Sequence, residues 1–120
     1  MASENEFITF LLEQLKPLGS VEAKSMFGGF GIYRQGLMFG LVSEDTLYLK
    51  ADEVNRREFD GKGLPRFTYE RRGKTLSMSY YQAPPEAMDS AKALCGWAQK
   101  AYDAAVRAAR KKPKKKRSKK

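Results

Sequence analysis

The sequence has no histidine and a single cysteine, Cys95, among its 120 residues. One cysteine excludes an intramolecular disulfide and fits a reducing compartment. Zinc is left without its usual ligands, and the acidic residues show no spacing typical of a calcium-binding loop. Because a nucleophilic thiol needs a neighbouring base or cation to lower its pKa, we expect Cys95 to be buried on a helix instead. We therefore predict no catalytic residue, no cofactor and no metal site.

Long apolar runs and a basic N-terminus are also missing. No stretch approaches the roughly 18 apolar residues that a membrane-spanning helix needs. The chain begins Met-Ala-Ser-Glu-Asn-Glu, which is acidic where a secretory signal is basic. A hydrophobic content of 42% is enough for one core in a chain of this length. These features predict a cytoplasmic protein with one folded domain, residues 1–109.

Acidic residues are absent from residues 110–120, which we call the basic segment. It holds nine of the 23 Lys and Arg residues, so the other 14 match the 14 Asp and Glu residues and the rest of the chain is formally neutral. Like charges repel and nothing apolar is available for burial, so we expect this segment to be disordered. The candidates for nonspecific contact with nucleic acid are its nine cations: Arg110, Lys111, Lys112, Lys114, Lys115, Lys116, Arg117, Lys119 and Lys120. The alternative is a tail that only improves solubility.

The first half of the sequence predicts one helix followed by strands. Ser3 and Glu6 have the spacing of a capping box, and apolar residues then recur at helical spacing over residues 4–15. Aromatic and β-branched residues predict strands over residues 21–33, 36–42 and 46–50. Gly28, Gly29 and Gly36 are expected where the chain turns or takes a positive φ.

The second half predicts a short helix, a hairpin and a long helix. Residues 52–59 are expected to form a helix capped by Asp52, with Val54 and Phe59 as its apolar contacts. Residues 67–71 and 75–81 alternate as a half-buried hairpin. Pro84-Pro85-Glu86 is expected to open the last helix, whose apolar stripe runs as far as Ala109. Arg56, Arg66 and their basic neighbours are interleaved with acidic residues, which predicts a solvated surface of mixed charge.

These pieces, in this order, resemble the N-terminal domain of the TfoX/Sxy family over about residues 4 to 106. The residues that carry the resemblance include Met26-Phe27-Gly28-Gly29, Leu47-Tyr48-Leu49-Lys50, Met78-Ser79-Tyr80-Tyr81 and Pro84-Pro85-Glu86. The structural fingerprint consists of Lys24, Met26, Phe27, Gly28, Gly29 and Gly31. The resemblance implies an α+β two-layer sandwich: an antiparallel sheet of about five to six strands, with the N-terminal and the long C-terminal helix packed on one face.

The resemblance also implies a link to regulators of competence for DNA uptake, a domain that is often dimeric, and no catalytic residues. We therefore expect a non-enzymatic regulatory or adaptor module: a homodimer that binds a protein partner in transcription regulation, while the basic segment holds DNA or RNA without sequence preference. Two alternatives stay open. One is a small enzyme with acid and base groups in a pocket, for example Glu70, Tyr48 and Lys50. The other is a structural dimer with a solubility tail.

Overall fold

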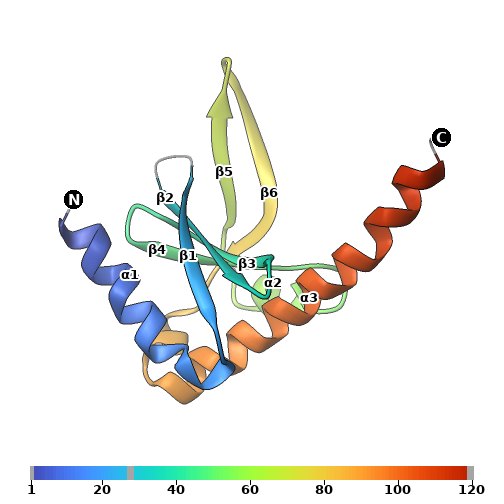
Figure 1. Cartoon of the computed structure of the whole chain (residues 1–120). Helices are drawn as coiled ribbons and strands as arrows, with labels where there is room; N and C mark the ends of the chain where they lie inside the picture. Colours follow the sequence, from blue (N-terminus) through green and yellow to red (C-terminus); the bar gives the residue numbers. More distant parts are fainter. Residues whose placement is uncertain (1, 27–28, 119–120) are drawn as a thin grey trace.

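The computed structural model describes the chain over residues 2–26 and 29–118. Helices and short 3-10 turns flank a single sheet (Figure 1). The elements in chain order are α1 (Ala2–Gln14), η1 (Lys16–Leu18), β1 (Val21–Met26), β2 (Gly29–Arg34), β3 (Leu37–Ser43), β4 (Thr46–Lys50), α2 (Arg56–Gly61), β5 (Arg66–Arg71), β6 (Lys74–Gln82), η2 (Pro85–Met88) and α3 (Ala91–Ser118). The expected α+β class is confirmed.

The sheet has six strands in the order β1-β2-β3-β4-β6-β5, and every neighbouring pair is antiparallel. Tight turns join β2 to β3 and β5 to β6. Gly36 in the first of these turns has a φ of +80°, as the sequence predicted. Among the described strands, the order in the sheet departs from the order in the chain only at β5 and β6. The connection through α2 leads from β4 to the edge strand β5, and β6 then pairs with β4. The end of β4 therefore lies beside β6 and α3.

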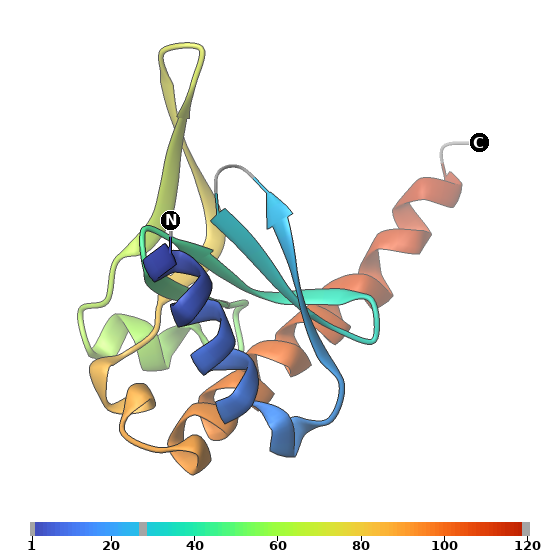
Figure 2. The same cartoon turned by 60° about the vertical axis from the view of Figure 1, so that its left-hand side comes forward.

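The main core lies between the sheet and the helices, which form a second layer (Figure 2). Leu11 comes from α1, Leu15 follows the last residue of α1, and Leu94 and Ala98 come from α3. They pack in one cluster with the strand residues Ile32, Phe39, Val42, Leu47, Leu49 and Tyr81. Phe39 and Val42 are three residues apart on β3, and both reach this core because the pairing of β2 with β3 shifts register after Ile32. The expected packing of both helices on one face is confirmed.

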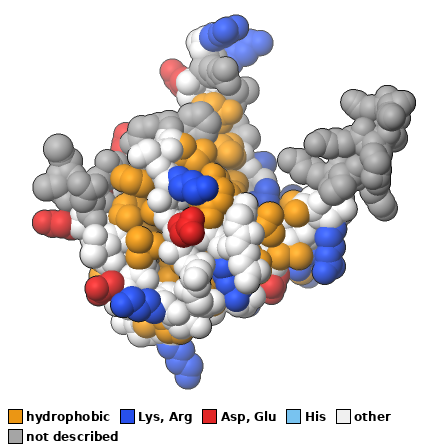
Figure 3. All heavy atoms as spheres, viewed as in Figure 1, with side chains coloured by type: hydrophobic (Ala, Val, Ile, Leu, Met, Phe, Trp, Pro, Cys, Tyr) orange, Lys and Arg blue, Asp and Glu red, His pale blue; other side chains and the backbone are white. Residues whose placement is uncertain are grey.

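The other face of the sheet carries a smaller apolar group that we call the open-face cluster. Tyr80 belongs to it, whereas its neighbour Tyr81 belongs to the main core, because successive residues of β6 point to opposite faces. Its members all come from strands: Met38, Leu41, Tyr48, Phe67, Tyr69, Met78 and Tyr80. Figure 3 shows hydrophobic side chains between β1 and the β5–β6 hairpin. Among the described residues, no helix contributes to this cluster.

The starts of two helices, α1 and α3, differ from the predictions. The backbone is already helical at Ala2, so Ser3 lies inside α1 and does not precede it. The long helix begins at Ala91, where the Ala93 N–H donates to Ser90 Oγ at 3.0 Å. Pro84-Pro85-Glu86 leads instead into the 3-10 turn η2, because a serine cap five residues after Pro85 starts a new helix.

The α2 region also differs from its prediction. The helix begins at Arg56, four residues after Asp52, whose side chain closes a turn before the helix. Val54 lies in that turn with 65% of its side chain exposed, so it makes no core contact there. Phe59 is buried as expected, with its ring 5.3 Å from Tyr81 and 5.5 Å from Trp97 between centroids.

Candidate functional site

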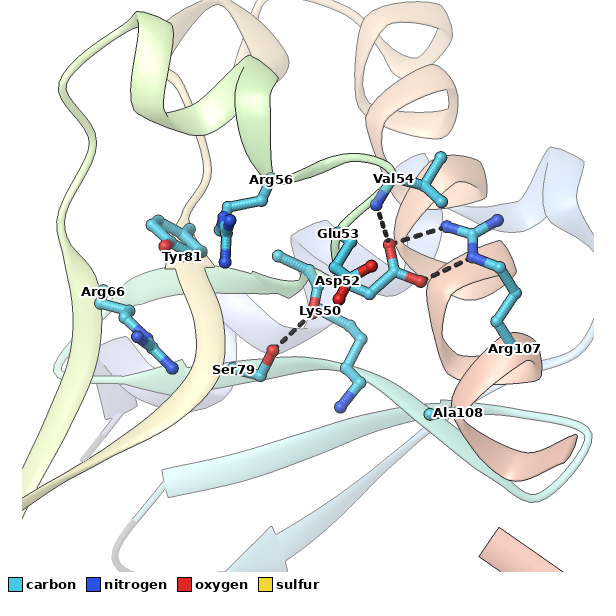
Figure 4. Close-up of a pocket in the computed structure, with 11 residues that line it drawn as sticks. Lys50, Asp52, Glu53, Val54, Arg56, Arg66, Ser79, Tyr81, Arg107 and Ala108 are labelled. Carbon is cyan, nitrogen blue, oxygen red and sulfur yellow. Dashed lines mark hydrogen bonds and ion pairs between the residues drawn. The ribbon is translucent and has the colours of Figure 1, made fainter. Parts of the chain in front are cut away.

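The candidate site is a pocket of about 360 Å³ where the end of β4 meets β6 and α3 (Figure 4). Residues from the β4–α2 connection form one wall, β5 and β6 form a second, and α3 forms a third. Its lining residues are Lys50, Ala51, Asp52, Glu53, Val54, Arg56, Arg66, Ser79, Tyr81, Arg107 and Ala108. Four are cationic and two are acidic, so the lining carries excess positive charge.

The β4–α2 connection is held by side chains that replace regular backbone pairing. Asn55 is buried, and its Nδ2 donates to the Lys50 carbonyl at 3.1 Å while its Oδ1 accepts from the Asp52 N–H at 2.7 Å. Asp52 Oδ1 accepts in turn from the Val54 N–H at 3.0 Å. The Ser79 hydroxyl donates to the Ala51 carbonyl. These bonds hold the backbone at the floor of the pocket in place, because they satisfy its polar groups with side chains of the same region.

An ion pair closes the α3 side of the pocket. Arg107 Nε donates to Asp52 Oδ2 at 2.6 Å and Arg107 Nη2 donates to Asp52 Oδ1 at 3.0 Å, a two-bond arrangement that matches the guanidinium fork. The hydrogen bond from Arg107 lowers the pKa of Asp52 to about 2 against the opposing effect of burial. Asp52 is therefore ionised at neutral pH.

Two further arginines line the pocket, Arg66 from β5 and Arg56 from the start of α2. Arg66 Nε donates to the Met78 carbonyl at 3.2 Å, and its guanidinium lies 5.8 Å from the centroid of the buried Tyr81 ring. Arg56 Nε lies 3.7 Å from Asp60 Oδ2, a long and exposed ion pair. Figure 4 shows both guanidinium groups beside Tyr81, away from the Asp52–Arg107 pair. The sequence prediction of a mixed, solvated surface missed this convergence, because β5 must cross to the edge of the sheet to bring Arg66 near Arg56.

The acid–base group named for the enzyme alternative is not brought together. Lys50 lines the pocket, but Tyr48 is not among the lining residues and packs in the open-face cluster. Glu70 is exposed on the β5–β6 hairpin. Asp52 and Arg107 line the pocket together with Lys50. They lie 55 positions apart in the sequence, and no spacing in the sequence indicates that they meet.

The fingerprint residues lie on β1 and β2, away from the pocket. A Cβ at Gly31 would lie 2.8 Å from Met26 Sδ and 3.0 Å from Met38 Sδ, so glycine makes room for two methionines. A Cβ at Gly29 would lie 2.1 Å from the Val42 carbonyl oxygen. Gly29 has no positive φ, so close approach of β3, not the expected backbone conformation, requires glycine there. Phe27 and Gly28 lie outside the described residues.

Comparison with known proteins gives the family of the chain. The sequence matches the TfoX N-terminal domain family over residues 13–105. The chain belongs to this family. It is 33% identical over 79 residues to DNA transformation protein TfoX1 of Aliivibrio fischeri (strain ATCC 700601 / ES114), covering 65% of this chain and 35% of that protein. It is 30% identical over 70 residues to protein Sxy of Escherichia coli (strain K12), covering 58% of this chain and 34% of that protein. The chain thus spans about a third of the length of these relatives.

In this TfoX N-terminal domain the basic segment continues α3 as far as Ser118, where the sequence predicted disorder. Pro113 lies within this helix, where it removes one backbone hydrogen bond. Figure 1 shows the last turns of α3 extending away from the sheet. Arg110 is exposed, and the side chains of residues 111–120 lie outside the described part.

Cys95 is only half-buried on α3, where its Sγ donates to the Gln14 carbonyl at 3.3 Å. Burial raises the pKa of this thiol, which disfavours the thiolate that a nucleophile needs. Within residues 2–26 and 29–118, no three metal-ligating side chains lie together. None of the helices in the same part of the chain is long and apolar enough to cross a membrane.

Proposed function

We propose that this TfoX N-terminal domain is a non-enzymatic regulatory or adaptor module of the cytoplasm that acts in DNA transformation. In this proposal the folded part binds a protein partner in transcription regulation, and the basic segment holds DNA or RNA without sequence preference. The similarity to relatives named for DNA transformation supports the first part. The unbalanced charge of the basic segment, nine cations and no acid, supports the second.

Contact with phosphates, not bases, is the expected mode of binding. A lysine is a flexible point charge without the rigid fork that reads a base edge. The basic segment would therefore raise the local concentration of the module on nucleic acid and leave sequence choice to its partner.

The test is titration of duplex DNA with the full chain at several salt concentrations. If about six cations neutralise phosphates, the slope of log K against log salt is roughly −5, and binding at physiological salt is micromolar or weaker. Deletion of residues 111–120 should abolish this binding and leave the melting temperature unchanged. Scrambled duplexes of equal length should bind equally well.

Two outcomes would contradict this proposal. Binding that survives the deletion with an unchanged slope would move the nucleic-acid site to the folded part. No binding by the full chain at low salt would favour the alternative of a structural dimer with a solubility tail. The enzyme alternative receives no support from the pocket, whose carboxylate at Asp52 is held ionised by Arg107.

Homodimerisation is a further part of the proposal. The open-face cluster supports it, since four of its side chains are only partly buried in the single chain: Met38, Tyr48, Tyr69 and Met78. A second copy that covers this face would bury them without any new secondary structure.

A further inference from the structure

Arg56 and Arg66 both line the pocket, and neither side chain is held by a two-bond pair of the kind that joins Arg107 to Asp52. Arg66 Nε donates to the Met78 carbonyl, and Arg56 Nε faces Asp60 at 3.7 Å. The Arg56–Asp60 contact is too long for a hydrogen bond and is exposed on both sides, so it neutralises Arg56 only weakly. Two guanidinium groups held in this way present the planar donor pairs that match the oxygens of a phosphate.

The carboxylates of the pocket do not cancel this charge. Asp52 is already neutralised by the two hydrogen bonds from Arg107 on the opposite side. Glu53 is the other acidic lining residue, and Lys50, Arg56 and Arg66 outnumber it in the lining. The remaining lining therefore favours an anion, and a dianion such as a phosphate monoester more than a carboxylate.

An apolar hollow adjoins the pocket and indicates which kind of chemical group the ligand carries besides its anionic group. This hollow, of about 290 Å³, shares Lys50 and Ala108 with the pocket, and its other lining residues are Leu37, Met38, Ala105 and Ala109. A ligand with a phosphate at one end and an apolar or planar body at the other would fill both spaces. The pocket alone, at about 360 Å³, is within the size range of small-molecule sites.

We propose that this pocket binds a small phosphate monoester of nucleotide size. The phosphate lies between Arg56 and Arg66 beside Tyr81, and the body of the ligand extends toward Ala108 and the apolar hollow. The site is separate from the basic segment and from the proposed contact with nucleic acid. Binding would bridge α2, β5 and α3, so the ligand would also stabilise the folded state by mass action.

The test is calorimetric titration of the full chain with three probes: AMP, adenosine and inorganic phosphate. AMP should bind at one site per chain with a micromolar to sub-millimolar dissociation constant, adenosine should not bind, and inorganic phosphate should bind more weakly than AMP. Arg56→Gln and Arg66→Gln should each weaken AMP binding about tenfold or more, because each removes charged hydrogen bonds. Arg57→Gln is the matched control: Arg57 is exposed on the same helix and does not line the pocket, so AMP binding should stay unchanged.

A second variant separates this proposal from the function of the basic segment. Deletion of residues 111–120 should leave AMP binding intact even if it abolishes binding of duplex DNA. The proposal is overturned if AMP fails to bind at millimolar concentration or if the Arg56 and Arg66 variants bind AMP as well as the unmodified chain. It is also overturned if these variants lose binding of duplex DNA but keep binding of AMP, since the arginines would then contact a nucleic-acid backbone. Thermal melting of every variant checks that the fold is kept.

Discussion

The carboxylate of Asp52 receives both donors of the Arg107 fork, at 2.6 and 3.0 Å, and so joins the β4–α2 connection to the middle of α3. Both side chains are largely covered, with 25% of Asp52 and 35% of Arg107 exposed. The same carboxylate also accepts the Val54 N–H. One residue therefore fixes the turn before α2, the wall of the pocket and the position of α3.

Removal of this ion pair should destabilise the domain. Asp52→Asn and Arg107→Gln should each lower the free energy of unfolding, and the double variant should show a coupling of about 1–2 kcal/mol, discounted for partial exposure to solvent. Urea unfolding of the four proteins gives the coupling. Arg56→Gln is the control, since its pair with Asp60 is exposed on both sides and should cost less than about 0.5 kcal/mol. Additive effects of the two substitutions would contradict a direct interaction.

The same pair predicts a dependence of stability on pH. The pKa of Asp52 is about 2 in the folded state against an ordinary value of 3.8, so the unfolded state binds more protons between these values. The contribution of Asp52 is therefore complete above about pH 4 and is lost as the pH falls toward 2. Melting temperatures of the unmodified chain and Asp52→Asn should converge on acidification. A constant gap from pH 7 to pH 2 would show that the carboxylate is not the titrating group.

The sequence predicted the layers of this fold better than its pocket. Period-two and helical patterns depend on neighbours in the chain, so the order and type of the strands and helices, and the buried position of Phe59, were predicted, whereas the first residues of α1, α2 and α3 were not. Val54 was predicted as a core contact because its side chain is apolar. In the structure the Val54 N–H donates to Asp52 Oδ1 within a turn, and the Val54 side chain is exposed to solvent. Arg56, Arg66 and Arg107 line one pocket because of the order of the strands in the sheet, and local sequence patterns do not predict that order.

Two glycines should respond in opposite ways to the same substitution. Gly29→Ala should destabilise the domain by about 1–3 kcal/mol, because its Cβ would lie 2.1 Å from the backbone oxygen of Val42, which cannot rotate away. Gly96→Ala should stabilise it by up to about 1 kcal/mol, because Gly96 is exposed inside α3 and a Cβ there meets no atom within 4 Å. Denaturant unfolding of both variants tests the pair. A loss of stability in Gly96→Ala would mean that another chain contacts this side of α3.

The last prediction concerns the homodimer proposed through the open-face cluster. Light scattering should report a mass near twice 13.6 kDa at high protein concentration and a shift toward the monomer on dilution. Met78→Glu should hold the protein as a monomer, because it places a charge among partly buried apolar side chains that a second copy would cover. Val54→Glu is the matched control: it adds the same charge at an exposed hydrophobic residue on the α2 side, where no dimer contact is proposed. A monomer at every concentration would remove the dimer, and a Val54→Glu monomer would place the interface elsewhere. A Met78→Glu dimer with an unchanged dissociation constant would likewise exclude the open face as the contact.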